Sequence, residues 1–467
     1  MENVKSQGFL KTDQYDDLKD KVYDEAAIRD LAFRLDFLPT GKTFVKVFAL
    51  VLLGMIVRSV DFYLASGVNA SLLHLGFANV SQSALFLSGG SLGLFLGALY
   101  AGEMGDRFGR TNAYQWNLLF FAVMTAACAF APNMTWMIVF RCLSSIGMGA
   151  ELVIGFAMVN EMAPVKSRGK WAVGMTAITT WGSPLGMYLC SLVVPAYGWR
   201  VLFAGVGVVA VLVWFLRAFM PESPRWLFTQ GRYAEAERMV RVFEADDPDH
   251  DAHLAAAKAE LAAKAKKAPQ KDLQLMGTQL FWRFVLASLM LTVTDVLQYT
   301  FTQWVPTLLT KSGGSFESSL LMSTIMLIAA PLGALVGMVT VEKWGRKFNL
   351  VVGFVATTIC GLVYATQTSN LGHMVAGFVL TFFIYVLIST MFGAFVPEMF
   401  PTKFRMRGTG IANAAAKLGT VLSPFAVAAL LSSLGTNSVF FAMSLLAAVA
   451  VLVTVFFVPE TRNKHID

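Results

Sequence analysis

Residues 105–110 read GDRFGR and residues 342–347 read EKWGRK, so one kind of short charged motif occurs twice in the chain. Gly109 aligns with Gly345 at an offset of 345 − 109 = 236 residues. Two more pairs follow in the same order: EMAPVKSRG (161–169) with EMFPTKFRMRG (398–408), at 398 − 161 = 237, and PESPR (221–225) with PETR (459–462), at 459 − 221 = 238. Three ordered matches at nearly constant spacing indicate that the chain consists of two related halves.

The sequence between these motifs is apolar. Of the 467 residues, 56% are hydrophobic and only 14% are charged, and the mean hydropathy is +0.60. Soluble domains carry about 25% charged residues. No Asp, Glu, Lys or Arg occurs within 350–397 or within 418–459. A bilayer core requires about 20 apolar residues per helix, so each of these stretches holds two spans and a turn. The composition therefore predicts an all-α polytopic membrane protein.

Charges and turn residues divide the sequence into about twelve spans of membrane length. The spans are expected at 44–66, 82–102, 112–131, 135–160, 171–194 and 200–219 in the first half, and at 281–305, 317–340, 348–367, 373–396, 408–430 and 437–458 in the second. The predicted segments are a cytoplasmic N-terminal segment (1–42), an N-terminal six-helix bundle (43–219), a cytoplasmic amphipathic linker (220–280), a C-terminal six-helix bundle (281–458) and a cytoplasmic tail (459–467). The linker is interpreted either as a coupling element between the halves or as a solvated tether.

The loop charges predict the orientation. Lys and Arg concentrate after even-numbered spans, whereas connections such as 131–136 and 369–373 lack them. The positive-inside rule then places the charged loops and both termini in the cytoplasm. An offset of six helices leaves both halves in the same orientation, a parallel repeat that suits a solute path between them. Because no large external loop is expected, we predict a multi-pass protein of the bacterial inner membrane.

Several other classes of protein are not indicated. The net charge of +7 is explained by the loops, so we expect no nucleic-acid partner. The sequence lacks H-E-x-x-H and G-x-x-x-x-G-K-[ST] motifs, and neither an enzyme nor an ATP-driven pump is predicted. The four cysteines lie in apolar stretches without metal or disulfide spacing. We expect no metal and no cofactor.

The loop motifs resemble those of the major facilitator superfamily. The resemblance is carried by GDRFGR after the second span, E-x-x-P-x-x-x-R-G from Glu161 and PESPRWL from Pro221. PESPR and the terminal PETR are similar to its sugar-porter and organic-ion branch, and RLDFLP (34–39) is closer to niacin, aromatic-acid and synaptic-vesicle-protein-like members. Span seven, DVLQYTFTQWVPTLL (295–309), lacks the paired-Gln motif typical of sugar porters. The resemblance implies a secondary transporter with alternating access.

The charged loops predict a gate. Cations complement the exposed carbonyl groups at the C-terminus of a helix, and acidic partners occur within reach of the same loops. Glu161 with Arg168, and Glu398 with Arg405 or Arg407, supply opposite charges within reach of these loops. We expect these groups to form an ion-pair belt that is intact when the carrier opens outward and broken when it opens inward. Static helix-end charges are the alternative. The candidate gating residues are Asp106, Arg107, Arg110, Glu161, Arg168, Arg346, Glu398 and Arg405.

Ionisable residues inside spans are costly and are functional by default. Asp61 is the main candidate for proton coupling, since burial favours its neutral form and a nearby cation its charged form. The resemblance to proton-coupled sugar porters implies that Asp61 works against Arg141. Alternatively Asp61 pairs permanently with Arg58, three residues earlier on the same helix face. Glu151 is interpreted as a second proton carrier, a site for a cationic solute or a packing acid.

The solute site is expected near mid-bilayer between the halves. Aromatic rings and amides suit a flat, partly apolar solute. Lys417 either meets an anionic carboxylate or neutralises Asp295. The candidate binding residues are Gln298, Tyr299, Gln303, Trp304, Tyr385, Asn413, Lys417, Asp295 and Trp181.

Together these features predict proton-coupled symport of a small organic ion, such as an aromatic or nicotinate-like acid. The expected partners are the solute, protons and the lipid bilayer, and the protein is expected to act as a monomer. A proton-coupled or facilitative monosaccharide transporter is one alternative. A transport-inactive, receptor-like member of the same fold is another.

Overall fold

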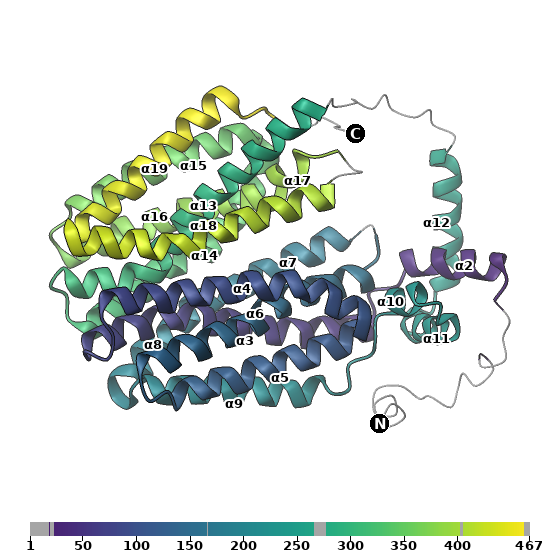
Figure 1. Ribbon diagram of the computed structural model, residues 1–467. Helices are drawn as coiled ribbons and strands as arrows, with labels where there is room; N and C mark the ends of the chain where they lie inside the picture. Colours follow the sequence, from purple (N-terminus) through teal and green to yellow (C-terminus); the bar gives the residue numbers. More distant parts are fainter. Residues whose placement is uncertain (1–17, 19–22, 166, 266–276, 402–404, 462–467) are drawn as a thin grey trace.

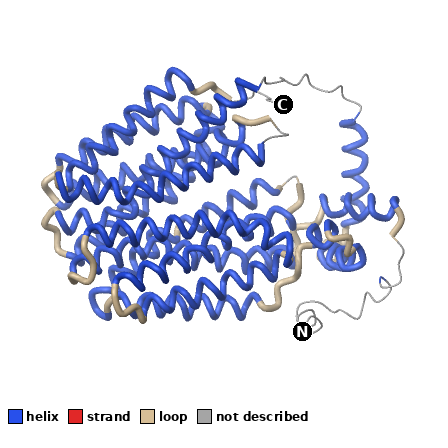
Figure 2. Tube along the Cα trace, in the orientation of Figure 1, coloured by secondary structure: helices blue, strands red, loops and turns tan. Residues whose placement is uncertain are grey.

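The computed structural model describes residues 18, 23–165, 167–265, 277–401 and 405–461, and helices dominate throughout (Figures 1 and 2). A short helix, α2 (Glu25–Asp36), precedes the first half. The helices of that half are α3 (Lys42–His74), α4 (Val80–Phe108), α5 (Arg110–Ala129), α6 (Met134–Met162), α7 (Arg168–Thr180), α8 (Gly182–Tyr197) and α9 (Trp199–Arg217). The linker contains α10 (Pro224–Thr229), α11 (Tyr233–Glu244) and α12 (His250–Ala265).

The second half repeats this plan. Its helices are α13 (Gly277–Lys311), α14 (Phe316–Trp344), α15 (Arg346–Thr366), α16 (Asn370–Thr390), the π-helix η2 (Met391–Phe395), α17 (Val396–Glu398), α18 (Arg405–Ser433) and α19 (Thr436–Phe457). In the described residues, 11 helical segments are long and apolar enough to cross a membrane, with α7 and α8 counted as one. The twelfth expected span is α5, whose 20 residues include Asn112, Gln115 and Asn117 near its start. The prediction of an all-α polytopic protein with two bundles is confirmed.

The repeated glycines make the turns that define one end of the bundles. Gly109 (φ 92°) separates α4 from α5, and Gly345 (φ 91°) separates α14 from α15. These positive φ values favour glycine, because a Cβ clashes with the backbone there. We call the end of the bundles that carries these two glycines the charged end, and the opposite end the short-loop end.

The linker and α2 pack together beside the first half, at the charged end (Figure 1). Arg34 of α2 forms an ion pair of 2.5 Å with Glu244 of α11, and Arg225 of α10 forms one of 2.7 Å with Asp36. The side chain of Arg34 is largely buried, so these pairs fix α2 against the linker helices.

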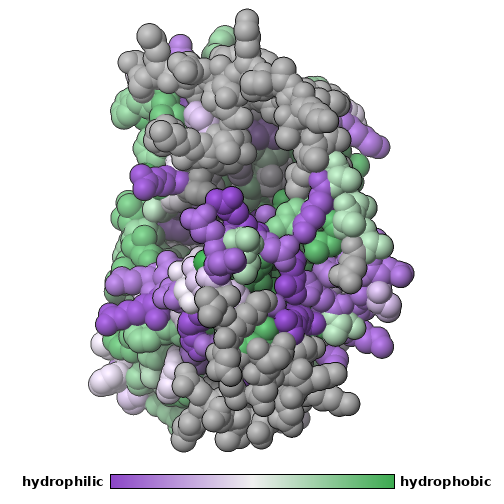
Figure 3. All heavy atoms as spheres, turned by 90° about the vertical axis from the view of Figure 1, so that its right-hand side faces the viewer, coloured by the Kyte–Doolittle hydropathy of each residue, from purple (hydrophilic) through white to green (hydrophobic). Residues whose placement is uncertain are grey.

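The two halves contact each other along α3–α13, α4–α18 and α8–α14. Toward the short-loop end, the Ser66 hydroxyl donates to the carbonyl groups of Thr302 and Gln303, both at 2.9 Å. Farther along α3, the rings of His74 and Phe316 stack with centroids 5.2 Å apart. At the charged end the ribbons of the halves diverge, and the surface is hollowed between them (Figures 1 and 3). The structure is therefore closed at the short-loop end.

Candidate functional site

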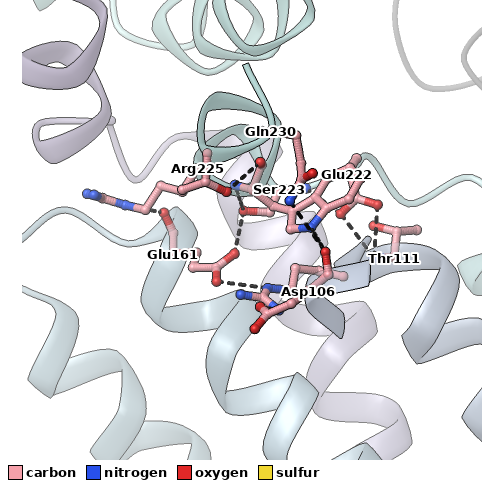
Figure 4. A network of polar contacts seen from close by, with 10 residues as sticks. Asp106, Thr111, Glu161, Glu222, Ser223, Arg225 and Gln230 are labelled. Carbon is pink, nitrogen blue, oxygen red and sulfur yellow. Dashed lines mark hydrogen bonds and ion pairs between the residues drawn. The ribbon is translucent and has the colours of Figure 1, made fainter. Parts of the chain in front are cut away.

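A polar cluster holds the charged end of the first half together. Arg110 forms ion pairs with Asp106 at 2.6 Å and with Glu161 at 2.9 Å. The other carboxylate oxygen of Glu161 accepts a hydrogen bond of 2.6 Å from the Ser223 hydroxyl (Figure 4). The cluster thus ties the α4–α5 turn to the end of α6 and to the start of the linker.

Glu222 completes this cluster beside the glycine turn. Its carboxylate accepts hydrogen bonds from the backbone N–H groups of Thr111 at 3.1 Å and of Ser223 at 2.8 Å (Figure 4). Burial raises the pKa of the Glu222 carboxyl, although these hydrogen bonds act in the opposite direction. The indole N–H of Trp226 donates to the Asp106 carbonyl at 2.9 Å. The PESPR motif therefore caps the turn that GDRFGR forms.

The second half contains the same cluster. Arg346 forms ion pairs with Glu342 at 3.0 Å and with Glu398 at 2.5 Å. The Thr461 hydroxyl donates to Glu398 at 2.6 Å, and Glu460 accepts from the Arg346 backbone N–H at 3.0 Å. Each of these contacts has a counterpart in the first half. The three repeated motifs therefore form the same set of contacts in both halves.

The structure brings only part of the predicted ion-pair belt together. Glu161 meets Arg110, whereas the Nε and Nη2 atoms of Arg168 have no hydrogen-bond partner in the described structure. Glu398 meets Arg346. The cause is geometric, because the glycine turn points the α5 and α15 arginines back at the ends of α6 and α17.

Two other gating candidates, Arg107 and Arg405, are not part of either ion-pair cluster as the structure describes it. Arg107 is exposed, with its guanidinium 5.5 Å from the Phe108 ring centroid. The side chain of Arg405 lies outside the described residues. Each of the two ion-pair clusters lies within its own half and links elements of that half only. A gating role for them stays a prediction.

The proton-coupling candidates Asp61 and Arg141 form a buried ion pair between α3 and α6. One Arg141 nitrogen lies 2.5 Å from Asp61 Oδ2, and the two side chains are 3% and 0% exposed. A second nitrogen of Arg141 donates to the Asp61 carbonyl at 3.3 Å. Of the two pairings that the sequence left open, the structure contains the one with Arg141 and not the one with Arg58.

A small cavity lies beside this pair, between α3, α4, α6 and α13. Its lining includes Arg141, Ser145 and Gln303. Three nearby buried oxygen atoms, Asp61 Oδ1, Ser145 Oγ and Gln303 Oε1, have no hydrogen-bond partner. Since buried polar atoms are normally satisfied, this polar cavity is suited to hold a water molecule next to the Asp61–Arg141 pair.

Glu151 has a partner that the sequence analysis missed. Arg217, at the end of α9, lies 2.6 Å from Glu151, and both side chains are at most 1% exposed. Arg217 also donates to the Leu50 carbonyl at 2.9 Å and to the Tyr114 hydroxyl at 3.0 Å. A cation in the last turn of a span is usually read as an interfacial residue. The sequence feature that points to such a partner is Glu151 itself, because a carboxylate this deep in a span requires a cation.

The second half has its own buried pair. Lys417 Nζ lies 2.7 Å from Asp295 Oδ2 and 3.4 Å from the Tyr299 hydroxyl. Of the two interpretations of Lys417, the structure shows the neutralisation of Asp295. The pair joins α13 to α18. Asp295 lies close to the repeat equivalent of Asp61, at an offset of 295 − 61 = 234 residues.

A cluster of hydroxyl and amide groups joins the halves near these pairs. The hydroxyl groups of Tyr63 and Tyr385 are 2.5 Å apart, and the Gln298 amide donates to Tyr385 at 3.2 Å. The ring of Phe62 meets that of Tyr299 edge-on, with centroids 5.4 Å apart. Tyr63 and Phe62 were not among the sequence candidates, because the sequence of span one does not distinguish them from aromatic residues that face lipid or the core.

The remaining binding candidates have other surroundings. Trp304 is 1% exposed within the hydrophobic core, so the structure does not place its ring on an open path. Asn413 donates to the Thr409 carbonyl of its own helix at 2.9 Å. Trp181 is 48% exposed at the junction of α7 and α8. Gln303 is buried, and its backbone carbonyl accepts from Ser66 at 2.9 Å.

Comparison with known proteins identifies the family. The family model described as sugar (and other) transporter matches residues 40–467. The chain belongs to this family, within the major facilitator superfamily. It is therefore a multi-pass membrane transporter of small molecules, and the family consists of transporters rather than enzymes. Within the described residues no group of His, Cys, Asp and Glu side chains could hold a metal ion.

Individual members show how close the similarity is. The inner membrane metabolite transport protein YdjE of Escherichia coli is 30% identical over 93% of this chain and 97% of its own length. The niacin transporter NiaP of Acinetobacter baylyi is 29% identical over 94% of this chain and 99% of its own length. The xylose transporter XylE of E. coli, in a partially occluded inward-open conformation, has the same fold, with a TM-score of 0.72 and 18% identity over 90% of this chain and 99% of that one.

Proposed function

We propose that this member of the family is a proton-coupled symporter of a small organic anion, such as an aromatic or nicotinate-like acid. The observation that carries the proposal is the Asp61–Arg141 pair, a fully buried carboxylate held by a single arginine beside a polar cavity. A proton carrier must exchange its proton with water, and a cavity suited to a water molecule next to the carboxylate supports that role.

Proton coupling follows from the electrostatics of this pair. Ionised Asp61 is stabilised by Arg141, and protonated Asp61 releases it, so the position of Arg141 relative to α3 depends on the proton. A change of contact between α3 and α6 alters the packing of the first half near its interface with the second half, which we call the seam (α3–α13, α4–α18 and α8–α14). Protonation of Asp61 then favours one conformation of the carrier, and loss of the proton favours the other.

The preference for an aromatic acid is supported by the groups around the seam. Aromatic side chains and convergent polar groups are typical of sites for flat organic solutes, and NiaP, a relative, is named as a niacin transporter. The hydroxyl and amide cluster of Tyr63, Tyr385 and Gln298 also suits a monosaccharide. XylE is named as a xylose transporter, so a sugar is the second candidate.

The orientation belongs to the same proposal. Placing the charged end in the cytoplasm, in accordance with the positive-inside rule, makes this structure open to the inside and closed at the short-loop end. Both termini then lie in the cytoplasm. The host membrane is proposed to be a bacterial inner membrane, as in the relative YdjE, and the functional unit is proposed to be a monomer.

Uptake into proteoliposomes under an imposed pH gradient tests the proposal. The panel contains nicotinate, benzoate, an organic cation and D-xylose. Gradient-driven accumulation of an aromatic acid is expected for the wild type and for Glu103→Gln, a control that removes an exposed acid from α4. Asp61→Asn should abolish the accumulation. Accumulation of xylose alone would favour the second candidate, and accumulation by Asp61→Asn equal to that of wild type would rule out the assigned proton site.

A further inference from the structure

The charged residues deep in the membrane-spanning helices do not balance. Three acids lie there, and each has its own cation: Asp61 with Arg141, Glu151 with Arg217, and Asp295 with Lys417. Arg58 of α3 is a fourth cation, and it has no ion pair with any described acid. Its Nε atom is buried without a hydrogen-bond partner.

Other arginines without an ion pair have an ordinary explanation. Arg168 is the first residue of α7, and Arg283 lies in the second turn of α13, so both are at the charged end of the bundles. Both also have buried guanidinium atoms without a hydrogen-bond partner, and what sets them apart from Arg58 is their position near helix ends, within reach of water and lipid headgroups. Arg58 lies more than four turns into α3, which begins at Lys42. An uncompensated cation at such a depth is strongly unfavourable.

The surroundings of Arg58 point to a ligand rather than to a missing structural partner. Phe62 lies one turn beyond Arg58 on the same face of α3, and its ring packs against those of Tyr63 and Tyr299. The two tyrosines belong to the seam between the halves, where Tyr63 contacts Tyr385 and Tyr299 contacts Phe62. Arg58 therefore lies one helix turn from aromatic rings contributed by both halves.

The position along α3 also places Arg58 on the open side of the seam. The halves are joined through Ser66 and, farther on, through His74. Arg58 lies about two turns nearer the charged end than Ser66, on the side where the surface is hollowed between the halves (Figure 3). Part of the residue remains exposed although its Nε atom is buried, which leaves access for a solute from that side.

We propose that Arg58 is the anion-binding residue of the transport site and takes the carboxylate of an aromatic acid. This inference rests on the proposed function and names its specificity determinant. A guanidinium binds a carboxylate through two parallel hydrogen bonds, and the Phe62 and Tyr299 rings supply an apolar wall for an aromatic group. The bound anion completes the charge balance that the protein alone leaves open. Neutral amides of the same acids lack the charge and should bind poorly.

Binding to the purified full-length protein tests this without any proton gradient. Isothermal titration at a fixed pH near 7 is performed with nicotinate and benzoate, and with nicotinamide and benzamide as neutral counterparts. The wild type should prefer each acid over its amide. Arg58→Gln should weaken acid binding at least about 10-fold, as expected for the loss of a charge-assisted contact, and should leave amide binding unchanged. Arg58→Lys should retain part of the affinity, and Arg283→Gln, the matched control, should retain all of it.

Thermal stability of the same variants separates a binding role from a structural one. Removing a cation that has no partner should leave the ligand-free protein at least as stable, so Arg58→Gln should fold and melt no lower than wild type. A failure to fold, or unchanged acid affinity in Arg58→Gln, would overturn the inference and leave the proposed function intact. If the wild type itself binds neither acid, the proposed function fails, and the role of Arg58 fails with it.

Discussion

The buried pair of Glu151 and Arg217 makes the sharpest prediction about stability. Arg217 makes an ion pair of 2.6 Å with Glu151 and donates to the Leu50 and Val51 carbonyls and the Tyr114 hydroxyl, all with no solvent exposure of its own. Arg217→Met keeps an unbranched apolar stem but leaves the Glu151 carboxylate without a cation. Breaking a buried pair from one side costs about 3–5 kcal/mol, which is a large share of the stability of a typical protein.

The double variant separates the pair from the packing. Replacing both charges, with Glu151→Gln and Arg217→Met, removes the uncompensated carboxylate, so the double variant should be more stable than Arg217→Met alone. Midpoints of thermal unfolding in detergent, followed by tryptophan fluorescence, give the order of the variants. Arg200→Met is the matched control, because Arg200 is an exposed arginine at the other end of the same helix, and it should change the stability by less than about 1 kcal/mol.

Two outcomes would refute this reasoning. An Arg217→Met protein as stable as wild type would mean that the Glu151 carboxylate needs no cation. A double variant whose loss equals the sum of the two single losses would mean that the residues do not interact.

Three further predictions follow from the charged end. Arg110→Ala should lower the turnover in transport assays more than the solute affinity, since it loosens the α4–α5 turn without touching the seam; unchanged turnover would contradict this. Gly109→Ala should destabilise the protein by about 1–2 kcal/mol, because φ is 92° there, whereas Gly102→Ala, in mid-helix with open space around it, should be neutral or slightly stabilising in the same melts. Contact with Asp247 raises the pKa of the exposed His253 above its usual 6.5, so the His253–Asp247 contact should be fully present below pH 6.5 and weaken as the pH rises through the higher value; an NMR titration should show Asp247→Asn moving the midpoint back.

Much of the architecture could be predicted because it depends on local sequence. Apolar runs of fixed length specify membrane helices whatever their neighbours are, and the repeat offsets relate the halves without any contact information. The pairing of Asp61 with Arg141 was anticipated through the family resemblance. The repeated motifs around Gly109 and Gly345 are visible in the sequence, and their proposed role in gating stays a prediction.

The partners within the charged clusters depend on how helices are rotated and packed, which spacing alone does not determine. Arg168 is only seven residues from Glu161 in sequence, yet the partner of Glu161 is Arg110, 51 residues away. The burial of Arg217 follows from the packing of α9 against α3 and α5. Arg58 is one of two candidate partners for Asp61 by sequence spacing, and its lack of an acid depends on the contacts that pair Asp61, Glu151 and Asp295 with other cations.

The coupling of solute and proton movement is the central claim, and it can be measured directly. Proteoliposomes with an entrapped pH indicator receive an aromatic acid, with protein-free liposomes as the control for passive permeation of the acid. The wild type should show proton entry that accompanies solute entry above this background. Asp61→Asn should still exchange labelled for unlabelled solute but should show no solute-driven proton entry. Solute-driven proton entry in Asp61→Asn at the wild-type rate would contradict the account.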